Sequence, residues 1–515
     1  MKKQPKVLLI YPPNQLMSIE TPRPDGSLGP IYLAGALEKA GYETDILDAS
    51  VGPEDQNLKE TFYRSEMQAN GLVRIGMTIE SICDFIANGN YDIVGISSNF
   101  TPQIRIVLEV AATVKAISRD ILVLSGGVNA RNMPERLLKH GNIDAICSTE
   151  GERIVVNMIQ AWQKGKDLAE VSGVITMRDG KIIRKPLVPE DVYQDLDGLP
   201  FPAWEKLPFK HYDGISSSHA VLSINPGRYA PIATSRGCPF RCWYCHISTE
   251  KEREGDSGGI GSLRLKSIER VMEEVSRLKK LGVTKLFFED DSLLANKARI
   301  VEIFTRMRAM GFTIGAINGV NLVHLQKREG NRLIIDRDYL ALLRDSGFDQ
   351  IVFPVESANQ RILNKYATGK LHHDRLDIFE LVKIAAELGI VSPINMMIGF
   401  PDETEDEIRN SIEMGKEIVE AGAPYCTFFI PIPFPGSKLF EYAIANGHLS
   451  HDFDSDLLNW KHAVMKNTTV APERIVELRD WGWSYANSKE YIRSRIEASA
   501  GHRWQSGAAE LVVKN

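Results

Sequence analysis

The sequence predicts an α/β protein with a doubly wound parallel sheet near the N-terminus, a (β/α)6 partial barrel after it and a helical region at the C-terminus. Apolar strand-like runs alternate with helix patterns in two separate stretches of the chain. Within each stretch the strands end in small, polar or acidic residues. At 515 residues the chain is also too long for one hydrophobic core, so two or three domains are expected.

The first predicted domain, residues 1–165, begins with the apolar run 7–10 and a helix pattern over 30–40 that Gly41 ends. Further strand-like runs lie at 44–47, 93–96, 122–124 and 144–146. Continuous apolar runs are typical of strands buried between two helix layers, which predicts a Rossmann-like domain. Ligands bind such sheets beyond the carboxyl ends of the strands. The loops expected there are rich in Gly, Ser, Asn and Thr and span residues 11–29, 97–103, 126–131 and 149–152.

Residues 166–225 are predicted to connect two domains. Residues 174–184 should form a β-hairpin, because Asp179-Gly180 favours a two-residue type I′ turn. The proline- and aromatic-rich stretch 199–212 predicts a rigid linker that lies against the second domain. His211 within it is expected to be structural.

The second predicted domain, residues 226–436, should be the partial barrel. Its strands are expected at residues 232–234, 285–288, 313–317, 350–355, 393–398 and 427–430. Active sites of such barrels lie at the carboxyl ends of the strands, so the polar residues there should face one chamber. Residues 437–515 are expected to be helical, with the aromatic residues of 472–496 packed against the barrel and a mobile tail from residue 501.

Three of the six cysteines lie within the segment Thr234-Ser-Arg-Gly-Cys238-Pro-Phe-Arg-Cys242-Trp-Tyr-Cys245. Thiolates in a Cys-x3-Cys-x2-Cys spacing suit an iron–sulfur cluster or zinc. Three ligands leave one iron of a cluster open to bind a substrate or cofactor. A zinc site completed by His246 is disfavoured, because no second Cys-x2-Cys or His-x3-His follows. A disulfide is disfavoured too, because cysteines this close in a chain without a secretion signal are more often metal ligands.

Composition narrows the class of protein. Hydrophobic residues make up 43% and charged residues 25% of the chain, which is ordinary for a globular protein. The formal charge of −6 argues against a nucleic-acid-binding surface. No apolar run reaches 18 residues, so no membrane span is expected. The start of the chain leads directly into a short strand without a signal-peptide pattern, and we expect a cytoplasmic protein.

The cysteine segment, with Tyr244 just before the third cysteine, resembles the cluster signature of radical S-adenosylmethionine (SAM) enzymes. This resemblance implies a 4Fe-4S cluster on the metal ligands Cys238, Cys242 and Cys245, with the open iron bound to the methionine part of SAM. It places acids for the SAM ammonium at the second barrel strand, ribose contacts at the fourth and adenine contacts at the fifth. The implied SAM residues are Tyr244, Asp290, Asp291, Glu356, Ser357 and Gly399. A helix N-cap cluster is the alternative for each acid.

Residues 5–165 resemble the cobalamin (B12)-binding domain that precedes many radical SAM domains. The resemblance rests on the order of Pro12-Pro13, Gly29-Pro30, Asp48, Val94-Gly-Ile-Ser97, Gly126-Gly127 and Glu150-Gly-Glu152. It implies cobalamin contacts at Tyr11, Pro12, Ser97, Asn99, Thr101, Gln103, Gly126, Gly127, Asn129, Glu150, Gly151 and Glu152. The loop after Ile10 has no histidine, so the implied cobalamin has its base displaced and either no lower protein ligand or an unexpected one. A ligand-free domain is the alternative.

Together the two resemblances imply a cobalamin-dependent radical SAM methyltransferase. It would methylate an unactivated carbon of a small molecule through a 5′-deoxyadenosyl radical and methylcobalamin, with electrons from a flavodoxin or ferredoxin. A non-methylating enzyme that forms or contracts a ring, or carries out another rearrangement, is the main alternative. A cobalamin-sensing non-enzyme is disfavoured by the cysteine triad. A methylthiotransferase would need a second triad before residue 160, where only Cys83 and Cys147 occur. Cys426, at the sixth strand, is expected in the core or lining the chamber.

Overall fold

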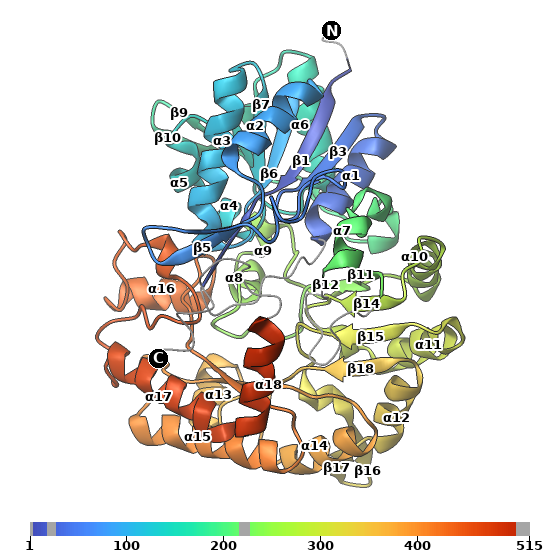
Figure 1. The fold of residues 1–515 in the computed structure, drawn as a ribbon, viewed down its shortest axis with the longest axis vertical. Helices are drawn as coiled ribbons and strands as arrows, with labels where there is room; N and C mark the ends of the chain where they lie inside the picture. Colours follow the sequence, from blue (N-terminus) through green and yellow to red (C-terminus); the bar gives the residue numbers. More distant parts are fainter. Residues whose placement is uncertain (1–3, 18–26, 216–226, 501–515) are drawn as a thin grey trace. The chain divides into compact units, whose positions relative to one another are not determined.

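The computed structural model describes residues 4–17, 27–215 and 227–500, which form two compact units (Figure 1). The first unit contains the described residues up to 215 and, from later in the chain, residues 253–260 and 499–500. The second contains residues 227–252 and 261–498. None of the helices described is both long and apolar enough to cross a membrane.

The first unit is built on a seven-stranded sheet in the order β10-β9-β8-β7-β6-β1-β3. Five of its strands are parallel: β1 (Lys6–Tyr11), β3 (Glu43–Asp48), β6 (Ile93–Ser97), β7 (Leu122–Gly126) and β8 (Ala145–Cys147). Counted along the chain, these five have the order 2-1-3-4-5, with the switch point between β1 and β6. Doubly wound sheets bind their ligands at this point.

Two helix layers cover this sheet because side chains of its strands alternate between two apolar faces. Leu8 and Ile10 of β1 pack in the core shared with α2 (Ile79–Gly89) and α3 (Ile104–Ile117). Val7 and Leu9 pack in the opposite core, with α1 (Leu28–Lys39) and α6 (Glu152–Gln163). The short helices α4 (Val128–Asn132) and α5 (Pro134–Leu138) follow β7. The predicted doubly wound sheet is thereby confirmed.

The predicted hairpin forms, and it extends the sheet at the β8 edge. β9 (Val174–Arg178) and β10 (Lys181–Arg184) are antiparallel, and β9 also pairs with β8. The turn residues Asp179 (φ 49°) and Gly180 (φ 71°) both have the positive φ that a type I′ turn requires.

The linker of residues 199–212 belongs to the first unit and packs on it. Tyr212 Oη donates a 2.6 Å hydrogen bond to Asp48 Oδ2 at the end of β3. His211 Nε2 lies 2.7 Å from the Pro53 carbonyl oxygen, which agrees with a structural role. The carbonyl oxygen of Phe201 occupies the place where a Cβ of Gly35 would stand, so a glycine in α1 admits this close approach.

Two parts of the first unit are absent from the sequence prediction. One is a small antiparallel sheet of β2 (Asn14–Met17), β5 (Leu72–Ile75) and β4 (Ser65–Met67). The other is α9 (Glu254–Ser257), which comes shortly after the cysteine segment. Thr149 Oγ1 donates a 2.7 Å hydrogen bond to the Ser257 carbonyl, which fastens this segment to the loop after β8.

The second unit has the six parallel strands of the predicted partial barrel. The first sheet is β11 (Tyr229–Ile232), β14 (Lys285–Phe288), β15 (Thr313–Ala316) and β18 (Phe348–Ile351). The second is β19 (Phe353–Glu356), β20 (Ile394–Met397) and β21 (Cys426–Phe429). β18 and β19 are two parts of the predicted fourth strand, interrupted at Val352. The strands alternate with helices, the larger being α10 (Ile268–Lys280), α11 (Lys297–Met307), α12 (Arg337–Asp345), α13 (Gln360–Tyr366), α14 (Ile378–Glu387) and α15 (Glu405–Glu420).

The C-terminal region forms α16 (Lys438–Ala445), α17 (Pro472–Ala486) and α18 (Lys489–Ala500). The predicted helical character of this region is observed, with α17 and α18 separated at Asn487. The Asn487 side chain accepts from Cys426 N (2.8 Å) and donates to Cys426 O (2.9 Å), which pairs the exposed edge of β21. Trp481 and Tyr485 stack on each other and are more than a third exposed, yet both contact helix α15 of the barrel. Arg409 and Lys416 lie over their rings, and Tyr485 Oη donates a 2.9 Å hydrogen bond to Glu413. The predicted tail from residue 501 lies outside the described residues.

Candidate active site and cofactor pocket

The cysteine segment follows β11 and runs into α8 (Ile247–Glu252). Gly237 has φ 78°, and a Cβ there would stand 2.4 Å from the Ser262 carbonyl oxygen. The Cys238 N–H donates to the Gly261 carbonyl at 3.2 Å, so this part of the loop lies tightly against residues 261–262. Cys242 is buried, whereas Cys238 and Cys245 are partly exposed.

The three thiols fit a cluster better than a single metal ion. No three His, Cys, Asp or Glu side chains in the described residues are arranged to hold one ion. A zinc ion needs four ligands within about 2.3 Å, whereas the cysteines of a four-iron cluster bind different irons. His246, the alternative fourth zinc ligand, has its Nδ1 2.9 Å from Glu250 Oε1. Burial raises the pKa of each thiol, so a bound metal would have to stabilise the thiolates.

Asp290 and Asp291, at the end of β14, have different environments. Asp290 is 2% exposed and accepts hydrogen bonds from Thr234 N (3.0 Å), Thr234 Oγ1 (2.8 Å) and Ser235 Oγ (2.5 Å). It therefore holds the strand end that leads into the cysteine segment. Asp291 is exposed and accepts from Gly237 N at 3.0 Å. Burial is the largest cause of the raised pKa of Cys238 and Cys245, and the negative charge of Asp291 also contributes to it. Asp291 is thus the acid open to a ligand.

Glu356, the last residue of β19, and Ser357, which follows it, also have different environments. Glu356 is buried with φ 70°, which is uncommon for a residue with a side chain, and its Oε1 lies 2.6 Å from Lys370 Nζ. Ser357 is fully buried, and its Oγ contacts Ser411 Oγ of α15 at 3.2 Å. Glu356 lies near the cysteine segment, because its charge adds to the effect of burial in raising the pKa of Cys242, while the Ser357 hydroxyl faces a helix. Lys370 has no counterpart among the residues inferred from sequence, because only the fold brings it to Glu356.

The segment after β20 packs on the aromatic residues near the cysteines. Phe400 stacks on Tyr366 with ring centroids 4.2 Å apart, and Tyr244 lies 6.1 Å from Phe400. Ile475 of α17 fills the space where a Cβ of Gly399 would stand. Glu403 Oε2 accepts from the N–H groups of Gly399 (2.7 Å) and Phe400 (3.0 Å), and burial raises the pKa of Glu403 to about 8. Sequence reasoning missed Glu403.

Cys426 does not line the chamber. It is fully buried, and a Cβ added at Gly415 of α15 would lie 2.9 Å from its sulfur. Its thiol therefore belongs to the core between β21 and α15.

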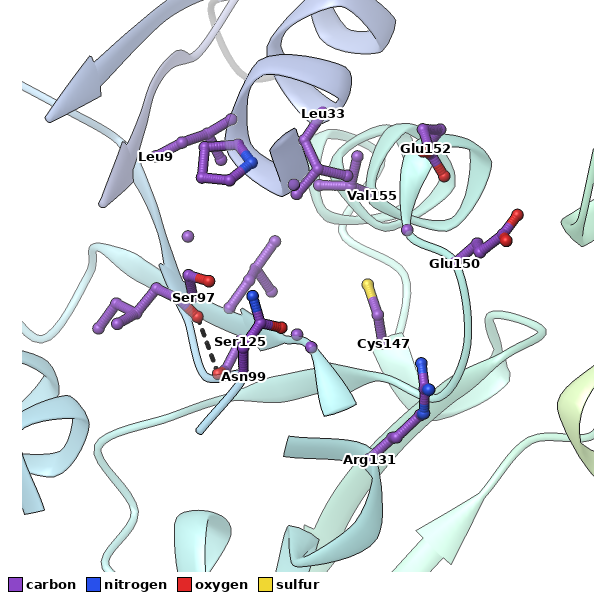
Figure 2. Close-up of a pocket in the computed structure, with 18 of the residues that line it drawn as sticks. Leu9, Leu33, Ser97, Asn99, Ser125, Arg131, Cys147, Glu150, Glu152 and Val155 are labelled. Atoms are coloured by element: carbon purple, nitrogen blue, oxygen red, sulfur yellow. Dashed lines mark hydrogen bonds between the residues drawn. The ribbon is translucent and has the colours of Figure 1, made fainter. Parts of the chain in front are cut away.

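A cavity of about 230 Å³ opens in the first unit at the switch point of the sheet (Figure 2). Its apolar wall is formed by Leu9, Leu33, Leu124, Val155 and Met158. Figure 2 shows the Cys147 sulfur directed toward this cavity, and burial raises the pKa of that thiol to about 12, so it stays protonated. Backbone without side chains borders the cavity at Gly126, Gly127 and Gly151. An apolar cavity with an accessible glycine backbone fits part of a large cofactor.

The structure places most, but not all, of the implied cobalamin residues at this cavity. Those that line it are Ser97, Asn99, Gly126, Gly127, Glu150, Gly151 and Glu152. Tyr11, Pro12, Thr101, Gln103 and Asn129 are not among its lining residues. Asn129 is buried and its Nδ2 donates to Ser98 Oγ at 2.8 Å, which holds the loop after β6. Arg131, the last residue of the predicted loop 126–131, also lines the cavity, whereas the apolar wall was not predicted.

Comparison with known families matches both units. Residues 26–159 match the model of the B12 binding domain, and residues 232–415 match that of the radical SAM superfamily. An uncharacterized methyltransferase of Pyrococcus horikoshii is 28% identical over 91% of this chain and 87% of its own. The cytidylyl-2-hydroxyethylphosphonate methyltransferase of Streptomyces wedmorensis is 26% identical, covering 90% and 86%. An anaerobic magnesium-protoporphyrin IX monomethyl ester cyclase of Synechocystis is 24% identical, covering 91% and 83%.

Among solved structures, the radical SAM methyltransferase TsrM of Kitasatospora setae, with cobalamin and a [4Fe-4S] cluster bound, is similar in fold. Its TM-score is 0.62 at 15% identity, over 97% of this chain and 91% of that one. The second unit therefore has the fold and the cysteine loop of a radical SAM domain. Because a B12 binding domain precedes it, the chain belongs to the cobalamin-binding radical SAM enzymes.

Proposed function

We propose that this enzyme methylates an unactivated carbon of a small molecule, with a 4Fe-4S cluster, SAM and cobalamin as cofactors. The observation that carries the proposal is the presence in one chain of a cysteine triad in a barrel loop and a glycine-bordered cavity at a sheet switch point. The methyltransferase names of the two most similar relatives reported above support methylation over other outcomes.

When bound, the cofactors would supply the 5′-deoxyadenosyl radical and the methyl group. Cys238, Cys242 and Cys245 would hold the cluster, and Asp291 would accept the SAM ammonium. Glu356 would bind the ribose hydroxyls, while Phe400 and Tyr244 would border the adenine. Asp290 and Glu403 would not contact the cofactors. They would act indirectly, by holding the loops that carry the contacting residues.

The cavity residues would carry the cobalamin. The backbone at Gly126, Gly127 and Gly151 would approach it closely, and Ser97 and Asn99 would offer hydrogen bonds. The apolar wall would exclude water from the part of the cofactor it encloses. Among the residues that the structure describes, no histidine lines this cavity, which favours a cobalt without a histidine ligand from these residues.

The second candidate is a ring-forming or rearranging enzyme with the same cofactors. The cyclase of Synechocystis, which matches nearly the whole chain, favours it. We also propose a cytoplasmic enzyme reduced by a flavodoxin or ferredoxin. The six free cysteines agree with a reducing compartment.

The test counts two products of SAM in reconstituted enzyme loaded with hydroxocobalamin. A methyltransferase with its substrate should release 5′-deoxyadenosine and S-adenosylhomocysteine in about equal amounts, because each methyl installed uses one SAM in each way. Deoxyadenosine without S-adenosylhomocysteine would instead support the rearranging enzyme. In the control, with Cys238, Cys242 and Cys245 all changed to Ala, iron binding and deoxyadenosine should both be lost. Stoichiometric zinc and no iron in the unmodified protein would refute the proposal.

A further inference from the structure

The turn Ala367–Lys370 lies directly against the cysteine segment. The Cys242 thiol donates to the Ala367 carbonyl oxygen at 3.7 Å, a normal distance for sulfur. Thr368 (φ 52°) and Gly369 (φ 67°) are both left-handed, and the Lys370 N–H donates back to the Ala367 carbonyl at 3.2 Å. A β-branched residue such as Thr rarely adopts this backbone. Such strain persists only where the surroundings impose it, often at functional sites.

The reversal of the chain brings the Lys370 ammonium into the interior. The side chain of Lys370 is 10% exposed, and its Nζ is 2.6 Å from Glu356 Oε1 and 6.0 Å from the Tyr244 ring centroid. Glu356 is equally buried and has its own positive φ. Both ends of this ion pair are therefore held by unusual backbone on either side of α13.

The cation of this pair is tied to the cysteine segment by geometry. Its own turn supplies the carbonyl oxygen, that of Ala367, which Cys242 Sγ contacts, and the Lys370 Nζ faces the ring of Tyr244, the neighbour of Cys245. Because little water reaches the pair, its field is weakly screened.

We propose that Lys370 is a positioning residue for the cluster: its buried cation, held by Glu356 and the Ala367–Lys370 turn, raises the reduction potential of the cluster and helps to retain it. The inference rests on the proposed cluster site. One-electron reduction adds a negative charge to the cluster, and a nearby cation stabilises the reduced form. No reaction step depends on Lys370; the electron comes from the external donor.

The experiment is a redox titration of the reconstituted full-length protein without SAM, followed by electron paramagnetic resonance. Lys370→Met should lower the equilibrium constant for cluster reduction about tenfold, which is about 59 mV for a one-electron couple. Glu356→Gln should shift it in the opposite direction. Lys365→Met is the matched control, because Lys365 is more exposed and pairs with Asp402 (3.0 Å). It should leave the potential unchanged.

A change below threefold in Lys370→Met with full iron content would overturn the inference. If Lys370→Met does not retain iron, Glu356→Gln decides: a potential raised by at least a threefold change supports the inference, and any other result refutes it. Lys370→Arg, which keeps the charge, should stay nearer the unmodified protein than Lys370→Met. Absence of a cluster in the unmodified protein would refute the proposed function itself, whereas an intact cluster with an unshifted potential refutes only the role of Lys370.

Discussion

Substituting the two adjacent acids after β14 should separate the stability of the cysteine loop from the binding of SAM. In Asp290→Ala, the Thr234 N–H and two hydroxyls lose their buried acceptor. An unsatisfied buried donor costs about 1–3 kcal/mol. The hydroxyls can rotate toward other acceptors, and the buried carboxylate no longer has to be desolvated. We therefore expect a loss of about 3 kcal/mol in the free energy of unfolding.

For a unit of this size, about 3 kcal/mol lowers Tm by roughly 6–12 °C. Calorimetry of the metal-free protein measures this effect, and iron analysis after reconstitution should show fewer irons per chain. Asp291→Asn is the matched variant: it is exposed with one backbone hydrogen bond, so Tm should change little. It should instead weaken SAM binding to the cluster-loaded protein at least tenfold, as expected for a lost charged hydrogen bond of about 1.5–3 kcal/mol. An Asp290→Ala protein with normal Tm and full iron that fails to bind SAM would refute this assignment.

Two further predictions follow from the same structure. Gly126→Ala should lower hydroxocobalamin retention after gel filtration at unchanged Tm, because its Cβ would lie 3.6 Å from Cys147 Cβ at the edge of the cavity. Gly127→Ala (φ 109°) should instead destabilise the protein by about 1–3 kcal/mol; equal Tm losses in both would contradict this. For Glu403, a folded pKa of about 8 above the unfolded 4.5 means that the folded state retains the proton, so stability falls as pH rises. Between pH 6 and 8 the native protein should lose about 2 kcal/mol that Glu403→Gln does not lose in denaturant titrations.

The strands could be predicted because their apolar runs are local. Lys285–Phe288 was placed with its observed bounds, and the turn Asp179-Gly180 has the expected conformation. The interruption at Val352 has one sequence signal, Pro354, because a proline cannot donate a hydrogen bond to a strand ladder. β4 (Ser65–Met67) is short and exposed, so it lacks the pattern of a buried strand.

The site was predicted less completely, because it depends on spatial neighbours. Cysteine spacing is a local property and identified the cluster loop, and glycines after strands identified the edge of the cavity. Adjacent residues after a strand tend to point in opposite directions, which predicts that Asp290 and Asp291 differ. Which of them is buried depends on Thr234 and Ser235, some 55 residues earlier. Lys370 and Glu403 matter through partners that only the tertiary fold supplies.

The SAM residues inferred from the sequence therefore fall into two groups. In the first group, neighbouring parts of the protein already take up the polar atoms or the space that SAM would need. Asp290 and Ser357 are committed to neighbouring segments, and the space beside Gly399 is filled by Ile475. Asp291 and Tyr244 lie with the cysteine segment instead. Glu356 lies there too, but its Oε1 is already held by Lys370. A group whose hydrogen bonds are used within the protein can bind a ligand only by giving them up, at a cost of about 1–3 kcal/mol for each donor left unpaired. SAM binding should therefore depend on the residues of the second group. Substitutions in the first group should instead lower the stability of the loops in which those residues lie.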